Sequence, residues 1–154
     1  MVADIAIGKI KMKANIFLVA VLFIGLAHSL VAKVPDLTAT VASVFDGDTF
    51  GATVHLENGA SVFVNVRIMN IDAPEMNGEC QYEKELAERA KNRLTELLPR
   101  DSTVTLSKIK DDKYLKRIDA LTLLANGDDV GKIMVREKLA VYYNGGKRQP
   151  WCKN

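Results

Sequence analysis

Two turn dipeptides, Asp46-Gly47 and Asn58-Gly59, constrain the fold of this chain more than any other feature. They separate three strand-like runs, residues 38–45, 49–57 and 60–71, which are rich in Val, Thr, Phe and Ile. Asp-Gly and Asn-Gly sequences favour tight turns between strands. The three runs are therefore expected to be neighbouring strands.

The rest of the chain completes the order of elements of a small barrel. Helical spacing predicts a helix over residues 79–98, capped by Asn77, with an apolar face formed by Tyr82, Leu86, Ala90, Leu94 and Leu97. Strands are predicted over 103–109 and 118–124, and a second helix over 129–138. This order predicts an α+β, mainly β fold, with a five-stranded OB-fold-type barrel and two to three helices.

The N-terminal segment has the pattern of a secretory signal. Lys13 precedes the uncharged apolar run 16–27, and small residues follow at Ala27, Ser29 and Ala32. A membrane anchor is the alternative, but a run of 12 residues from Ile16 to Ala27 is shorter than the ~20 that span a bilayer.

These features divide the chain into a signal peptide at 1–32, a short linker at 33–37 and a single domain at 38–154. Cleavage is expected within 27–33, and Met12 is a possible true start. The protein is then exported, either to the periplasm or out of the cell, without membrane attachment. Without residues 1–32, which carry three lysines and one aspartate, the 21 basic and 19 acidic residues become 18 of each. This balance argues against a polycation that coats nucleic acid, so any phosphate binding must be local.

The two cysteines, Cys80 and Cys152, both lie in the expected mature chain. An even count in an exported protein predicts a disulfide, with two free thiols as the alternative. The bridge would tie the C-terminal tail to the region after Pro74, and its long loop would contribute roughly 4 kcal/mol of stability.

Acidic residues cluster at turns beside the strands. Asp46 and Asp48 form one hairpin turn, and Asp72 and Glu75 flank the end of the strand that carries Arg67. Singly, each is typical of a solvated turn or a structural arginine. Together, they predict a site for Ca²⁺ or Mg²⁺, since close carboxylates repel each other without a cation. The arginine would then bind a phosphate.

The chain resembles the staphylococcal-nuclease-like, or thermonuclease, family over residues 38–152. The motifs that carry the resemblance are DGDTF at 46–50, VRIMNIDAPE at 66–75, CQYEKELAERAK at 80–91, DKYLKRIDA at 112–120 and the segment 129–152.

The resemblance implies a role for each matched residue of the site. Asp48 and Asp72 match calcium ligands, as does the backbone carbonyl of Ala73, and Glu75 matches the carboxylate that activates the attacking water. Two catalytic arginines that bind the scissile phosphate match Arg67 and Arg117. Nucleotide contacts are implied for Lys113, Tyr114 and either Tyr142 or Tyr143, of which Tyr143 is taken as the candidate.

One motif departs from the family. The family reads KYGR where this chain reads KYLKR, with one more residue and no glycine. If the loop bulges outward, Arg117 still reaches the phosphate. If the register shifts, Lys116 points inward and the bidentate fork of an arginine is lost.

The expected activity is calcium-dependent cleavage of DNA and RNA, with single strands preferred, little sequence specificity and 3′-phosphate products. A non-catalytic OB-fold module that binds oligonucleotides is the main alternative. A calcium-stabilised structural domain is a third, but it explains the acids and not the two arginines. Nothing in the sequence requires more than a monomer.

Overall fold

The first three strands form two antiparallel hairpins, as the turn dipeptides predict. The computed structural model describes residues 35–112 and 116–152. Strand β1 (Leu37–Val44) pairs with β2 (Thr49–His55), and β2 pairs with β3 (Ser61–Ile68). Strand β1 thus begins at the last residue of the predicted linker, and β3 is shorter than the predicted run.

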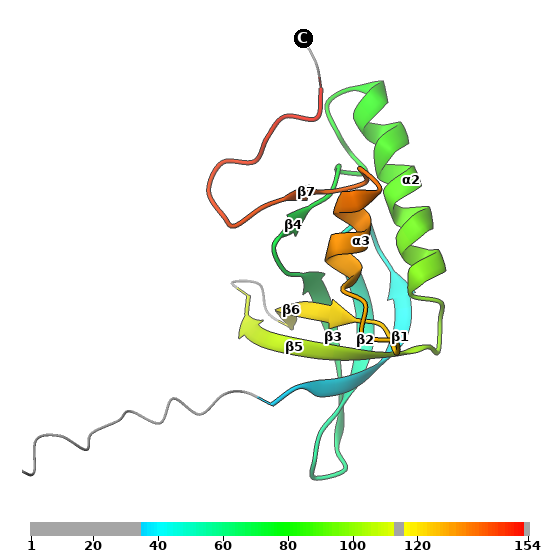
Figure 1. Ribbon diagram of the computed structural model, residues 1–154, viewed down its shortest axis with the longest axis vertical. Coiled ribbons are helices and arrows are strands. Elements are labelled where there is room, and N and C mark those ends of the chain that lie inside the picture. Colours follow the sequence, from blue (N-terminus) through cyan, green and yellow to red (C-terminus); the bar gives the residue numbers. More distant parts are fainter. Residues whose placement is uncertain (1–34, 113–115, 153–154) are drawn as a thin grey trace, which may run out of the picture. The chain divides into compact units, whose positions relative to one another are not determined.

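Two further strands close the barrel. Strand β5 (Thr103–Asp111) pairs antiparallel with β1 and with β6 (Arg117–Leu123), and β6 runs parallel to β3. The result is a closed five-stranded barrel in the order β1-β2-β3-β6-β5 (Figure 1), which confirms the predicted fold class. Apolar side chains fill its interior, among them Phe50, Val66, Ile68 and Leu106.

Helix α2 (Gln81–Leu97) packs on the barrel with a face that differs from the predicted one. Its N-cap is Cys80 rather than Asn77, and no side chain caps it. Tyr82 is 55% exposed, whereas Glu83 is buried beside the apolar positions. The predicted pattern placed Tyr82 on the apolar face because it is aromatic and lies four residues before Leu86.

The second helix, α3 (Val130–Arg136), is capped at its N-terminus by Asp129, whose side chain accepts a hydrogen bond from the amide of Lys132. It is fastened to α2 by Arg93, whose Nε and Nη2 donate to Glu137 at 2.8 and 3.0 Å. These are the two helices within residues 35–112 and 116–152, and neither has the length and apolar character needed to cross a membrane.

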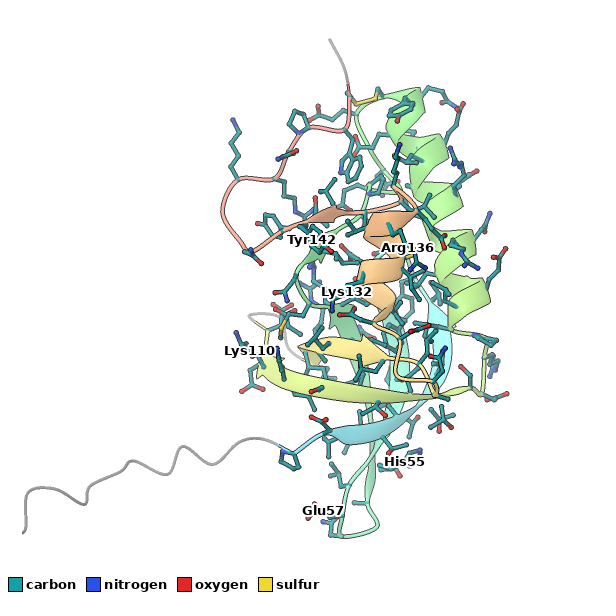
Figure 2. All side chains as sticks on the ribbon, viewed as in Figure 1. His55, Glu57, Lys110, Lys132, Arg136 and Tyr142 are labelled. Carbon is teal, nitrogen blue, oxygen red and sulfur yellow. A yellow bond between two sulfur atoms is a disulfide. The ribbon has the colours of Figure 1, made fainter. Side chains whose placement is uncertain are left out.

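A pair of two-residue strands lies beside the barrel and was not predicted. Strand β4 (Ile71–Asp72) pairs antiparallel with β7 (Val141–Tyr142). Asn70 adopts a left-handed conformation, with φ of 66°, and turns the chain from β3 into β4. The exposed Tyr142 on β7 lies far from the hairpin tip that His55 and Glu57 mark (Figure 2). The β4–β7 pair brings the C-terminal tail next to Asp72.

Candidate functional site

Arg67 joins the two acidic turns at the centre of the site. The register of β2 and β3 sets Arg67 opposite Thr49, the residue after Asp48. Its Nη2 lies 3.0 Å from Asp48 Oδ2 and 3.4 Å from Asp72 Oδ1. Its Nη1 donates to the carbonyl of Ile71 at 3.1 Å. The structure thus brings together three residues that lie up to 24 positions apart in the sequence.

The turn before β2 fixes the orientation of Asp48. The amide of Asp48 donates to Asp46 Oδ1 at 2.9 Å, and the Thr49 hydroxyl donates to Asp48 Oδ1 at 2.8 Å. Asp48 Oδ2 also accepts from the amide of Ala73 at 3.2 Å. Burial raises the pKa of Asp48, although the nearby Arg67 opposes the shift. The carboxylate is therefore costly to keep charged, and its hydrogen bonds and Arg67 stabilise it.

A second arginine, Arg148, contacts the acidic cluster formed by Asp48, Asp72 and Glu75. Its Nε lies 3.1 Å from Asp72 Oδ1, and its Nη1 bonds to Glu75 Oε1. Burial raises the pKa of Asp72, whose side chain is 2% exposed, and Arg148 opposes this shift. Sequence reasoning missed Arg148, because it lies 73 residues after Glu75 and the resemblance over the segment 129–152 assigns it no role.

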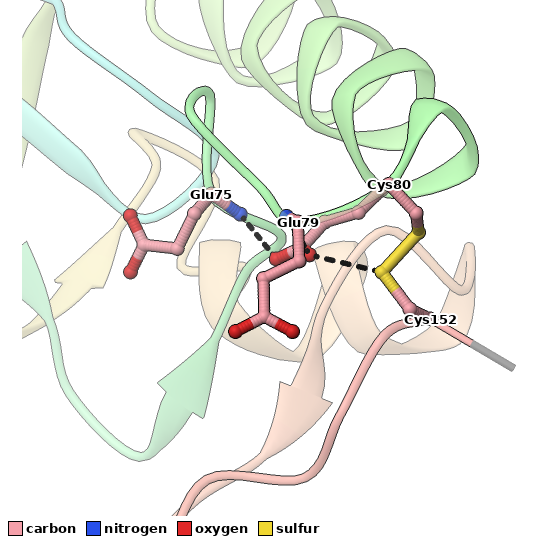
Figure 3. Close-up of a disulfide and its surroundings, with 5 residues drawn as sticks. Glu75, Glu79, Cys80 and Cys152 are labelled. Carbon is pink, nitrogen blue, oxygen red and sulfur yellow. Dashed lines mark hydrogen bonds between the residues drawn. A yellow bond between two sulfur atoms is a disulfide. The ribbon is translucent and has the colours of Figure 1, made fainter. Parts of the chain in front are cut away.

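The loop that carries Glu75 is fastened by Glu83 and by the predicted disulfide (Figure 3). Glu83 Oε1 accepts from the amide of Glu75 at 3.3 Å, and Oε2 accepts from the amide of Glu79 at 3.1 Å. Cys80 and Cys152 form a disulfide with a Cα–Cα distance of 5.9 Å. This confirms the predicted pairing and places the tail beside the Glu75 loop.

Arg117 and Arg67 line one hollow of about 430 Å³. Arg117 donates from Nε to Asp112, and Lys116 is exposed, so in the structure it is Arg117 that lines the hollow. Asp119 lies opposite Arg67 in the β3–β6 register. Its Oδ1 is buried without a hydrogen-bond partner among the described residues. Burial is the main cause that raises the pKa of Asp119, and the negative charge of the nearby Asp112 raises it further. Asp119 was not among the predicted site residues.

The predicted nucleotide contacts fall into two groups. Lys113 and Tyr114 lie outside the described residues. Tyr143 lines the same hollow as Arg67, and its hydroxyl donates to the carbonyl of Gly146 at 2.7 Å. Tyr142 faces a different hollow. Of the two tyrosines that the sequence left open, Tyr143 is therefore the one near the arginines.

The acidic cluster has the donor chemistry of a divalent-cation site. Asp48 and Asp72 each place a carboxylate oxygen within 3.4 Å of the same nitrogen of Arg67, so the two oxygens lie close together. Burial raises the pKa of both carboxyl groups. Hard oxygen donors of this kind suit Ca²⁺. Another group, Glu83 with Cys80 and Cys152, also lies close together, but the sulfurs of a disulfide are not available as thiolate ligands.

Comparison with known proteins identifies one family. The family described as staphylococcal nuclease homologue matches residues 65–152, which is more than half of the chain. The matched segment contains Arg67, Asp72, Glu75 and Arg117, and it ends at Cys152. No curated protein matches the chain.

Proposed function

The chain belongs to the family of staphylococcal nuclease homologues, and we propose that it hydrolyses phosphodiester bonds of DNA and RNA with calcium as its cofactor. One observation carries the proposal: Arg67 bridges Asp48 and Asp72 at the edge of a hollow that Arg117 also lines. Guanidinium groups match phosphate, and paired carboxylates match a hard cation. A module that only bound nucleic acid would have no use for acids in its phosphate groove.

Asp48 and Asp72 would hold the calcium ion, together with the carbonyl oxygen that the resemblance assigns to Ala73. Calcium, when bound, supplies a Lewis acid for a non-bridging oxygen of the phosphate. The amide of Ala73 and the Thr49 hydroxyl both donate to the carboxylate of Asp48 and fix its orientation.

The remaining steps fall to the arginines and to Glu75. A water molecule attacks phosphorus, and the carboxylate of Glu75 accepts its proton. Arg67 and Arg117 stabilise the negative charge that grows on the non-bridging oxygens. The bond from phosphorus to the 5′-oxygen breaks, and that oxygen takes up a proton from solvent water as it leaves. The products carry a 3′-phosphate and a 5′-hydroxyl.

The substrate is expected to be single-stranded or flexible, and cleavage is expected to show little sequence preference. Contacts to phosphate carry no base information, and the substrate contacts proposed here for Arg67 and Arg117 go to phosphate. The Cys80–Cys152 disulfide supports the proposal that the protein acts after export, since stable disulfides are typical of oxidising compartments.

The test is cleavage of heat-denatured DNA by the purified, oxidised protein with Ca²⁺, with Mg²⁺ or with a chelator. Arg67→Lys and Glu75→Gln should each lower kcat by about a hundredfold or more. Glu88→Gln, an exposed change on α2, is the matched control. The product ends are checked by polymerase extension, which a 3′-phosphate blocks until a phosphatase removes it.

Calcium-dependent cleavage that both site variants abolish would support the nuclease. A folded protein that binds single strands but does not cleave them in the presence of Ca²⁺ or of Mg²⁺ would refute the nuclease. That result would favour the oligonucleotide-binding module instead.

A further inference from the structure

The hollow beside the acidic cluster is lined by three arginines, whereas the resemblance assigns only two. Arg148 lines it together with Arg67 and Arg117. Arg148 also borders a second hollow of about 430 Å³, which Glu75 and Lys147 line. Its guanidinium therefore lies where the phosphate side of the site meets the Glu75 side.

The tail that carries Arg148 is fixed at both ends. At its start, β7 pairs with β4, and the amide of Tyr143 donates to the carbonyl of Asn70 at 2.9 Å. At its end, Cys152 is bonded to Cys80. Between them the chain turns at Gly145 and Gly146, whose φ values of 96° and 90° suit glycine. The position of Arg148 is thus set by the fold.

The contacts of Arg148 leave it able to serve a substrate. Its side chain is 47% exposed, and its ion pairs with Asp72 and Glu75 engage Nε and Nη1. A guanidinium carries five N–H donors. Two of these donors are on Nη2, which neither ion pair engages, so an anion in the neighbouring hollow can bind there while both ion pairs stay in place.

We propose that Arg148 is a third phosphate-binding side chain, which the disulfide-fastened tail delivers to a phosphodiester group of a single nucleic-acid strand lying in the hollow. This inference rests on the proposed function for its ligand class. It adds a contact from an element outside the barrel, and it makes strand binding depend on the Cys80–Cys152 bridge.

The test measures binding of a fluorescent oligothymidylate by the oxidised protein in a chelator, where no cleavage is needed, over a range of salt concentrations. Arg148→Ala should weaken binding roughly tenfold, the usual size of a lost charge-assisted contact. The slope of log K against log salt should fall by about 0.7, as expected for one phosphate contact on a single strand. Arg148→Lys should restore the slope but only part of the affinity.

Arg136→Ala is the matched control, because Arg136 is exposed on α3 (Figure 2) and lines neither hollow. It should leave both quantities nearly unchanged. Unchanged affinity and slope in Arg148→Ala would overturn the proposal. Tighter binding or faster cleavage by that variant would also overturn it, since Arg148 would then act only as a brake on Asp72 and Glu75.

The Cys80–Cys152 disulfide is proposed to act as a tether that holds the tail and Arg148 in place. This role is tested in the Cys80→Ser/Cys152→Ser variant, with circular dichroism to verify its fold. In this background Arg148→Ala should cost less than about threefold in affinity, because the tail no longer holds the guanidinium in place. A full tenfold cost would refute the tether. The wild type could bind single strands and yet fail to cleave them in the presence of Ca²⁺ or of Mg²⁺. The proposed nuclease activity would then be refuted, while the binding data would still decide the role of Arg148.

Discussion

Replacing Glu83 with alanine should destabilise the protein and slow its reaction at the same time. Glu83 is buried at the start of α2, and its two carboxylate oxygens accept from the amides of Glu75 and Glu79. Both amides belong to the loop that presents Glu75. The variant therefore removes the partners of two backbone donors in the loop that carries the proposed general base.

The magnitude follows from these two contacts. A hydrogen bond to a charged group contributes about 1.5–3 kcal/mol. The distances of 3.3 and 3.1 Å are long, which favours the lower end of that range for each bond. Water from the adjoining hollow can replace part of the loss. We expect Glu83→Ala to lower the free energy of unfolding by about 2–3 kcal/mol. Glu83→Gln keeps one acceptor oxygen and should lose about half as much.

Urea denaturation and steady-state cleavage of single-stranded DNA measure the two effects. Because Glu83 touches no substrate, its loss should lower kcat more than it raises KM. Glu88→Ala is the control, since Glu88 is exposed on the same helix. The reasoning is refuted if Glu83→Ala unfolds within about 0.5 kcal/mol of the control, or if kcat is unchanged.

Three further predictions follow from the same region. Gly78→Ala should lower the free energy of unfolding, measured in urea, by about 1–3 kcal/mol, because the added Cβ would lie 2.4 Å from the side chain of Glu83. An unchanged free energy of unfolding would contradict this prediction, because the loop would then have moved to accommodate the Cβ at no cost. Reducing Cys80–Cys152, whose sulfurs close a loop of 72 residues, should cost about 4 kcal/mol in the same assay; a loss below 1 kcal/mol would contradict it. Calcium at a hundred times its Kd should stabilise the fold by about 2.7 kcal/mol at neutral pH, measured by thermal melting. Because burial raises the pKa of Asp72, protons compete with calcium for this carboxylate at a higher pH than they would for an exposed aspartate, so the calcium effect should disappear as the pH falls through that raised pKa. Asp72→Asn should abolish it at every pH.

Local signals were sufficient to predict the barrel. The turns at 46–47 and 58–59 separate three strands that pair in chain order, and β5 pairs with β6 in the same way, whereas the β3–β6 and β1–β5 pairs join distant segments. The acids at both turns could be grouped because they follow adjacent strands. The disulfide followed from cysteine count and expected compartment.

The parts that could not be predicted depend on contacts between distant segments. Strands β4 and β7 have two residues each, too few to show any periodicity. Glu83 is a charged residue at a position that the helical spacing groups with Leu86 and Ala90, and the backbone amides of the preceding loop make its burial favourable. Arg148 stands in a polar tail, and its contact with Asp72 exists because β7 and the disulfide bring that tail back to the barrel.

The pairing of charges explains how so many acids can share this site. Asp48 and Asp72 are both buried, and each has a raised pKa, so without cations the cluster would favour protonation. Arg67 lies between them, and Arg148 lies between Asp72 and Glu75. Each arginine therefore pairs with two acids in the folded protein, and the two arginines share Asp72. The residue types at these positions are visible in the sequence, but the acids that each arginine joins are decided by the β2–β3 register and by the course of the tail.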